Sequence, residues 1–454
     1  MVGPTIQNDV FAHMIRFRAY KFVLTGDLEK MYRQFRIRKE DRKFQRIFWR
    51  RDIKNIEIFE LNTVTFRISS SSFLATRALQ QLADDEIDRY PEAAKTLKEE
   101  VYVDDFITGA DTIEKGIEKR EEIINLLKLG GLNIRQWASN DPQLLEGIPN
   151  NKINLNLQFN ENKTVKTLGV SWNSCNDNII YSVEPPNTLS KISKRIILSD
   201  ISKLFDPLGL LGPIILFAKI LMQQIWQSKL NWDESVPDTI PTTCIDFCEQ
   251  LKLINDLTFR RRFLIENPVN VQIHGFCDAS QKGYGACIYV RSIDSREKIE
   301  CHLLCAKSRV APLKTITLPC LELCSAVLLS NLFLSVYKSL NMPVHEITFW
   351  TDSSIALSWI NTSPHQLKTF VANRVSDIQK KTNGHNWKHV KSSDNPADSL
   401  SRGQKPAEFI MNKIWKEGPH WLKQTENTWP VSAFEIIKDS SKKKGRSFVN
   451  RVRH

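Results

Sequence analysis

Short apolar runs that end in acidic residues alternate along the chain with longer stripes of helical spacing. Residues 22–24 form an apolar run that ends at Gly26 and Asp27, which predicts a short buried strand. In residues 101–107 two acids interrupt an apolar run, which predicts a hairpin with the carboxylates at its turn. Residues 113–129 have the spacing of an amphipathic helix, and two glycines follow them. This part of the chain therefore mixes buried strands with amphipathic helices.

The pattern changes twice in the second half. Residues 150–163 are rich in Asn and predict a loop between subdomains, whereas residues 198–232 are helical with proline and glycine breakers. From Val269 strands follow one another, and then helices alternate with strands, which predicts an α/β domain over residues 269–403. The expected strands are residues 271–277, 286–290, 300–306 and 347–350, and the expected helices are residues 319–340 and 355–360.

Two apolar stretches raise the question of a membrane span. Residues 208–222 contain a proline and a lysine, and residues 323–337 contain several polar side chains. Both fall short of the roughly 20 apolar residues that a span requires. Residues 1–23 carry polar and charged side chains throughout, unlike a secretory signal. We expect core helices and no membrane partner.

Composition indicates a globular protein, and the positive charge is compatible with a polyanionic partner, although many basic proteins bind nothing acidic. Apolar residues make up 41% of the chain and charged residues 25%, with a formal net charge of +12. Residues 33–51 concentrate nine Lys or Arg among aromatic side chains. They could follow a nucleic-acid strand, or form an element with a solvated basic face and a buried aromatic face, which composition alone favours. Residues 438–454 predict a flexible basic tail.

The nine cysteines are scattered and odd in number, unlike a secreted disulfide framework. None has the spacing of a zinc site. We expect buried thiols in a reducing compartment.

Three acids form the first candidate site. Asp27 ends an apolar strand, and Asp104 and Asp105 lie between apolar and aromatic residues. Buried charges need a partner, and Mg²⁺ bound by a few carboxylates and substrate phosphates is a suitable one. An isolated pair of aspartates is more often a capped hairpin turn, so the neighbouring residues must decide.

Four further acids lie at the ends of elements in the second half. Asp278 and Asp352 each follow an apolar strand. Glu322 opens the long helix, and Asp398 lies in an Asn-Pro-Ala-Asp segment. Each acid alone would most often be a strand-end or helix-start residue.

The sequences around these acids resemble known retroelement enzymes. Tyr102-Val103-Asp104-Asp105, with Asp27 upstream, resembles motifs C and A of reverse transcriptases. The order Asp, Glu, Asp, Asp of the second set resembles the ribonuclease H (RNase H) active site. The resemblance covers about residues 1–403 and is closest to the BEL/Pao class of LTR retrotransposons. The segments that carry it are residues 2–7, 27–34, 102–111, 137–140, 199–209 and 395–403.

The resemblance implies roles for individual residues of the polymerase site. Asp27 and Asp104 would be its main metal ligands, with Asp105 in support. Tyr32 would lie under the incoming sugar and disfavour ribonucleotides. The other substrate-binding positions would be Phe66, Arg67, Leu168 and Gly169. The last two match the region that guides the primer terminus, although a glycine in a strand bulge explains them equally well.

In the RNase H site, the resemblance implies that all four carboxylates converge on two Mg²⁺ ions, which Mn²⁺ could replace. Such ions can activate water and stabilise the scissile phosphate of an RNA strand. Many RNases H also carry a histidine on a loop before the last acid. Here His385 precedes the expected last strand and His389 lies in it, so we expect both to be structural.

The implied fold class is α/β and α+β multidomain. Residues 1–149 would form a reverse-transcriptase palm with partial fingers, and residues 150–268 a helical thumb and connection. Residues 269–403 would form an RNase H-like α/β domain, and residues 404–454 a linker with the basic tail. Because all four acids of the second site lie in residues 269–403, we expect that segment alone to cleave RNA.

The implied function is RNA-directed DNA synthesis together with hydrolysis of RNA in RNA–DNA hybrids. The partners would be an RNA template, the RNA–DNA hybrid and deoxynucleoside triphosphates. A protease and an integrase would be neighbours in the parent polyprotein. The expected location is the cytoplasm, within a virus-like particle, or the nucleus.

Two departures from the family bear on polymerisation. Only 26 residues precede Asp27, too few for a fingers subdomain, so we expect an N-terminally truncated chain that synthesises DNA poorly. The family usually has Gly where Arg67 stands and Pro where Ser72 stands. A glycine lets the backbone approach template and nucleotide closely, whereas Arg67 could instead add a phosphate contact.

Two rival functions remain open. Asp278-Ala279-Ser280 and Asp352-Ser353-Ser354 resemble the Asp-Thr/Ser-Gly loops of aspartic peptidases, but both lack the glycine of such loops. A peptidase would also leave Glu322 and Asp398 unexplained. The other rival is an inactive remnant that only binds nucleic acid, which the presence of all seven acids disfavours.

Overall fold

The computed structural model describes residues 2–50, 55–159, 164–183, 193–234 and 239–430. The chain divides into two compact units, Met1–Ile179 and Ile180–His454. The expected basic tail at residues 438–454 lies outside the described residues, as do residues 160–163 of the expected Asn-rich loop. The rest of that loop contains a 3-10 turn, Asn150–Lys152, and the short helix α6, Leu155–Phe159.

The core of unit 1 is a four-stranded antiparallel sheet in the order β4-β5-β1-β6. Three helices share the apolar core with this sheet, around Phe106 and Trp137. The predicted strand, acidic hairpin and amphipathic helix are confirmed. The strands are β1 (Phe22–Leu28), β4 (Val101–Tyr102), β5 (Asp105–Ala110) and β6 (Ile134–Ser139), and the helices are α3 (Ser71–Asp85), α4 (Pro91–Glu99) and α5 (Ile113–Leu129). The unit also contains α1 (Val10–Ala19) and α2 (Met31–Gln34).

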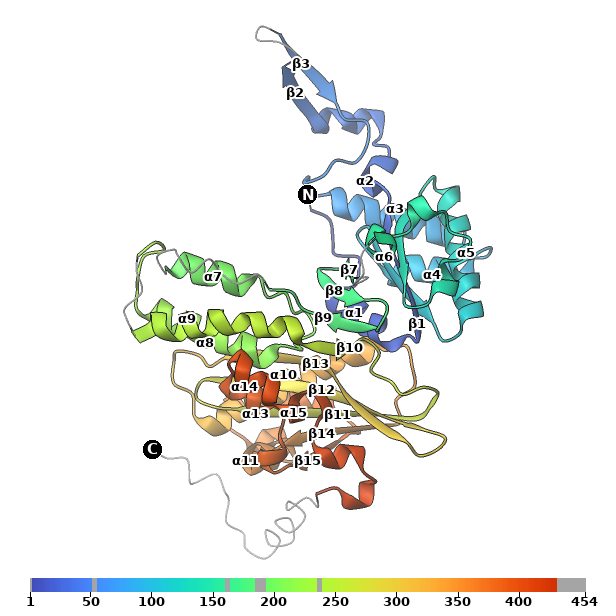
Figure 1. The fold of residues 1–454 in the computed structure, drawn as a ribbon. Coiled ribbons are helices and arrows are strands. Elements are labelled where there is room, and N and C mark those ends of the chain that lie inside the picture. The colour runs from blue at the N-terminus through green and yellow to red at the C-terminus, as the bar shows by residue number, and fades with distance from the viewer. Residues whose placement is uncertain (1, 51–54, 160–163, 184–192, 235–238, 431–454) are drawn as a thin grey trace, which may run out of the picture. The chain divides into compact units, whose positions relative to one another are not determined.

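The basic segment of unit 1 continues from a 3-10 helix, Lys39–Gln45, into a two-stranded hairpin. This hairpin, β2 (Arg46–Arg50) and β3 (Ile56–Glu60), projects from the rest of the unit (Figure 1). Phe48 and Trp49 are 76% and 57% exposed. The prediction of a buried aromatic face, which composition favoured, is therefore wrong. A lone hairpin has no layer of structure packed against it to cover either face.

A second small sheet contains β7 (Thr164–Thr167), β8 (Val170–Asn173) and β9 (Asn178–Ile180). Thr167 pairs with Val170, so Leu168 and Gly169 form the two-residue turn between β7 and β8. Their φ angles are +48° and +80°, as a type I′ turn requires. Gly169 thus lies in a hairpin turn rather than in a strand bulge.

Unit 2 is built on a five-stranded sheet in the order β13-β12-β11-β14-β15. β11, β12 and β13 are antiparallel, whereas β14 and β15 run parallel to β11. The predicted strands are all present, and the first three are longer than expected. Their bounds are β11 (Pro268–Ala279), β12 (Gly283–Asp294), β13 (Ile299–Val310), β14 (Glu346–Thr351) and β15 (Asn386–His389). The short strand β10, Thr258–Arg260, precedes them.

Helix α10, Leu318–Ser339, packs against β11 and β12. Its leucines approach the sheet closely, since a Cβ on Gly275 would lie 2.7 Å from Leu329 Cδ1. By length and composition α10 could cross a membrane, but 61% of its most apolar window is buried in the protein. These contacts are those of the core helix that the sequence predicted. Two further helices follow, α11 (Ser354–Ile360) and α12 (Thr369–Lys381).

The helical segment before the sheet is part of unit 2. It contains α7 (Lys194–Ser202), α8 (Gly212–Gln227) and α9 (Thr239–Gln250), and α8 packs against β13. Asp206 accepts hydrogen bonds from the Leu210 and Leu211 amides and so fixes the loop before α8. In the same loop the Leu208 carbonyl accepts a hydrogen bond of 2.8 Å from the Ala306 amide on β13.

The expected linker from residue 404 is instead packed against the sheet of unit 2. It forms α14 (Pro406–Met411), α15 (Lys413–Glu417) and two 3-10 turns, after the short helix α13 (Asp398–Arg402). Trp415 and Leu422 are fully buried, and Trp415 Nε1 donates to the Leu210 carbonyl at 2.8 Å. Residues 404–429 therefore pack against this unit and contribute Trp415 and Leu422 to its core.

Candidate metal centre and acidic hairpin

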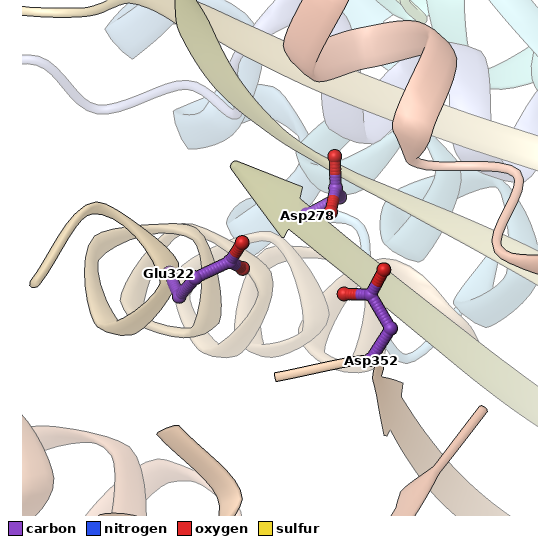
Figure 2. Close-up of side chains that lie close together, drawn as sticks. All are labelled: Asp278, Glu322 and Asp352. Carbon is purple, nitrogen blue, oxygen red and sulfur yellow. The ribbon is translucent and has the colours of Figure 1, made fainter. Parts of the chain in front are cut away.

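Three predicted acids of unit 2 meet at one edge of its sheet. β11 and β14 are parallel neighbours, and their last paired residues, Cys277 and Thr351, immediately precede Asp278 and Asp352. Glu322, near the start of α10, points toward both (Figure 2). One carboxylate oxygen of each residue lies within 4.8 Å of the other two. Within the described residues, this is the only group of three or more metal-ligand side chains at such separations.

The environment of the triad opposes negative charge. Burial, followed by the charge of Asp352, raises the pKa of Asp278 to about 7. Burial, followed by the charges of Asp278 and Asp352, raises the pKa of Glu322 to about 9. Asp278 Oδ2 and Glu322 Oε2 are buried and accept no hydrogen bond from the described residues. Buried carboxylate oxygens without donors fit a hard divalent cation, so the triad could bind a metal ion.

The fourth predicted acid, Asp398, is not in this group. It begins α13, and its Oδ1 lies 2.6 Å from Arg402 Nε one turn later. Its charge nevertheless contributes to the raised pKa of Asp278, so it lies near the triad. The structure brings together three of the four acids and places the fourth beside them.

Two polar residues hold α13 next to β11. Asn395 Nδ2 donates to the Cys277 carbonyl at 3.1 Å, and Ser280 Oγ donates to the Ser401 carbonyl at 2.6 Å. No role was predicted from the sequence for these side chains or for Arg402. The available signals were the position of Ser280 two residues after Asp278 and the helical spacing of Asp398 and Arg402.

Neither candidate histidine takes part in the triad. His385 packs edge-to-face against Phe333 with ring centroids 5.5 Å apart, and burial lowers its pKa. His389 Nε2 lies 3.1 Å from the backbone oxygen of Asp352. These contacts agree with the structural role that we expected for both rings.

The acids of unit 1 gather at the end of its sheet. Asp104 lies in the turn between β4 and β5, where Val103 has a φ of +56° and the Asp104 carbonyl accepts from the Leu28 amide at 2.8 Å. Burial, followed by the charges of Asp104 and Asp27, raises the pKa of Asp105 to about 6. Burial and then Asp104 also raise the pKa of Asp27. Arg135 on β6 offsets part of this repulsion, with its Nε 3.6 Å from Asp27 Oδ1.

Two of the predicted substrate-binding residues are in contact. The rings of Tyr32 and Phe66 meet at a centroid distance of 4.9 Å. Phe66 is 51% exposed, so the pair presents an aromatic surface to solvent. Arg67, next in the chain, has a φ of +65°, which glycine adopts freely and arginine rarely does. This matches the expectation that the position suits glycine.

Comparisons with known proteins agree with this geometry. Residues 193–353 match the family described as the Pao retrotransposon-like RNaseH-like domain. No curated protein matches the chain.

Two solved structures of a foamy viral protease-reverse transcriptase share its fold. One, the dRH form in complex with double-stranded DNA, is 13% identical with a TM-score of 0.53 over 86% of this chain. The other, in complex with an RNA/DNA hybrid, is 14% identical with a TM-score of 0.52 over 85%. The chain spans 60% and 46% of their respective lengths. The chain therefore has a mixed α/β fold that resembles retroviral reverse transcriptase, and its residues 193–353 are similar to the Pao retrotransposon-like RNaseH-like domain.

Proposed function

We propose that this chain is a reverse transcriptase and RNase H fragment of a BEL/Pao-type retrotransposon polyprotein. Its second unit would hydrolyse the RNA strand of RNA–DNA hybrids. The observation that carries this proposal is the buried triad of Asp278, Glu322 and Asp352, which lies in the segment that matches the Pao family.

The side chains of the triad would hold the divalent cations. When bound, two Mg²⁺ ions, or Mn²⁺ in their place, supply Lewis-acid activation of water and charge stabilisation at a phosphate. Without a cation, Glu322 keeps its proton at neutral pH because its pKa is about 9. Asp278 Oδ2 and Glu322 Oε2 are buried oxygens that accept no hydrogen bond from the described residues. Asp398 would add a fourth carboxylate beside them.

The acidic hairpin of unit 1 would be the polymerase site. Asp27, Asp104 and Asp105 would bind Mg²⁺ and deoxynucleoside triphosphates opposite an RNA template, and Tyr32 would select the sugar. The raised pKa values of Asp27 and Asp105 support a cation there. The exposed hairpin of β2 and β3 would contact nucleic acid with its basic and aromatic side chains.

The remaining assignments follow from the family resemblance. Residues 1–149 would be the palm with partial fingers, residues 150–268 the thumb and connection, and residues 269–403 the centre of the RNase H-like domain. The parent polyprotein would also supply a protease and an integrase. The chain would act in the cytoplasm, within a virus-like particle, or in the nucleus.

The test is cleavage of the RNA strand of a labelled RNA–DNA hybrid by the full chain. Mg²⁺ should be required, and Asp352→Asn should lower the rate by at least about 10²-fold because a ligand charge is lost. The matched control is Asp377→Asn on α12, which removes an acid paired with Lys381 and should leave cleavage unchanged. Cleavage by Asp352→Asn at the wild-type rate would refute the assignment.

The aspartic peptidase is the second candidate because Asp278 and Asp352 lie close together. An aspartic dyad uses no metal, and a third acid in contact with it has no role in that chemistry. Proteolysis should therefore be absent, and chelation with EDTA should abolish any activity of the chain. Pepstatin-sensitive cleavage of a polyprotein peptide that depends on Asp278 would favour the peptidase.

A further inference from the structure

Asp398 forms an ion pair beside the metal centre with Arg402, to which the proposed function gives no role. Arg402 Nε lies 2.6 Å from Asp398 Oδ1, and the two residues are one helical turn apart on α13. Their side chains are 68% and 37% exposed. An ion pair this accessible to water contributes only about 0.2–1 kcal/mol, so another cation can break it.

The backbone around this pair is fixed. The Asn395 and Ser280 hydrogen bonds hold α13 against β11, and Asn412 Nδ2 donates to Ser399 Oγ at 2.8 Å from the other side. Gly403 ends the helix with a φ of +74°, and a Cβ there would lie 2.9 Å from the Phe217 amide nitrogen. Because there is no room for even a Cβ between Gly403 and Phe217, the backbone can move little here. The parts of this corner that can move are therefore the side chains of Asp398 and Arg402.

The pair lies within the electrostatic field of the triad. The hydrogen bond and charge of Asp398 raise the pKa of Arg402, and the charges of Asp278 and Asp352 add to the effect. In turn Asp398 raises the pKa of Asp278. A cation at the triad would thus be near both members of the pair, attracting the carboxylate and repelling the guanidinium.

We propose that Arg402 is a positioning residue that holds Asp398 apart from the triad until a divalent cation competes for its carboxylate. The inference rests on the proposed metal centre. The triad, in which Asp278 and Glu322 are buried and Asp352 is half-buried, would bind the cation first. Asp398 would then leave Arg402 and bind the cation as well. Arg402 would therefore lower the cation affinity of the site, and its guanidinium would be released to solvent when the site fills.

The test measures cation binding rather than activity. Mn²⁺ binding to the full chain is followed by the loss of the EPR signal of free Mn²⁺, and the Asp352→Asn chain gives the blank for other sites. Arg402→Gln should bind Mn²⁺ up to about fivefold more tightly, the limit set by an exposed ion pair. The matched control is Lys381→Gln on α12. It removes an ion pair to Asp377 that has the same i, i+4 spacing, and it should leave the Mn²⁺ affinity unchanged.

A double-mutant comparison isolates the exchange. Asp398→Asn should weaken binding, and adding Arg402→Gln to it should alter the affinity by less than about twofold, since no carboxylate remains to be released. Binding is measured in about 0.3 M KCl so that long-range repulsion by an exposed guanidinium is screened. The inference would be overturned if Arg402→Gln bound Mn²⁺ with wild-type affinity. It would also be overturned if Arg402→Gln increased the Mn²⁺ affinity equally in the wild-type and Asp398→Asn chains. Equal Mn²⁺ binding by the wild-type and Asp352→Asn chains would instead overturn the metal centre itself.

Discussion

Asp27 on β1 lies directly opposite Asp105 on β5 in the antiparallel sheet of unit 1. Two like charges in this relation destabilise a sheet, and burial adds to the cost. The pKa of Asp105 is raised to about 6 by burial first and by its acidic neighbours next. The local fold is therefore under electrostatic strain that a bound cation would relieve.

This strain predicts a pH dependence of stability. A carboxyl group whose pKa is raised on folding does not destabilise the folded state at a pH below its unfolded pKa of about 4. The folded state then loses stability as the pH rises from about 4 to 6, the pKa of Asp105. Asp105→Asn should remove this loss, so the metal-free variant should exceed the wild type in stability at pH 7 and match it near pH 4. Urea denaturation at each pH measures the difference. Asp88→Asn, an exposed position on the same unit, is the control, and an equal gain there would contradict the explanation.

The packing of unit 2 changes the expected minimal RNase H fragment. Residues 269–403 contain all four acids but lack α8, which packs on β13, and Trp415, which is fully buried. We now expect residues 180–430 to fold and cleave hybrid RNA, and residues 269–403 to be unfolded or inactive. Circular dichroism and hybrid cleavage of the two purified fragments test this. Full activity of the shorter fragment would show that α8 and Trp415 are dispensable.

Gly209 should tolerate no side chain. It has a φ of +73°, and a Cβ would lie 2.0 Å from the Ala306 carbonyl oxygen. Gly209→Ala should therefore destabilise unit 2 by about 3 kcal/mol or more. Gly384 has a φ of +80° but no atom within 4 Å of such a Cβ, so Gly384→Ala should cost only about 1 kcal/mol for the left-handed backbone. Urea denaturation of both variants separates the steric contact from the backbone effect, and equal losses would count against the contact.

Arg67→Gly should increase DNA synthesis. The residue adopts a φ of +65°, which glycine reaches without strain and which would let the backbone come close to the template. Primer extension on poly(rA)–oligo(dT) measures the change. Arg67→Lys keeps both charge and strain and should behave as the wild type. If the guanidinium instead binds a phosphate, Arg67→Gly would reduce extension.

Local patterns in the sequence were enough to predict the five strands of the unit 2 sheet, three of the four strands of the β4-β5-β1-β6 sheet and most of the acids at their ends, but not β6 or the two smaller sheets. Apolar runs that end in an acid, such as the one before Asp278, predict a strand and the position of its carboxylate together. The burial of Trp415 was missed because it depends on Leu210, a contact between distant parts of the chain that no local pattern encodes. The pairing of Asp398 with Arg402 was missed for a different reason. The motif indicates a carboxylate near the site, but which neighbour that carboxylate binds depends on side-chain geometry.

The hydrogen bond from the Ala306 amide to the Leu208 carbonyl has a consequence for the behaviour of this protein at high concentration. β13 is the outermost strand of its sheet, and unpaired amides along such an edge recruit strands of other molecules. The loop before α8 already occupies the edge at Ala306, and α8 lies against the same strand. A foreign strand could pair with β13 at Ala306 only by displacing this loop. The segment that precedes the sheet thus protects it from edge-to-edge aggregation, and mutations that loosen the loop should reduce solubility before they affect any acid of the metal centre.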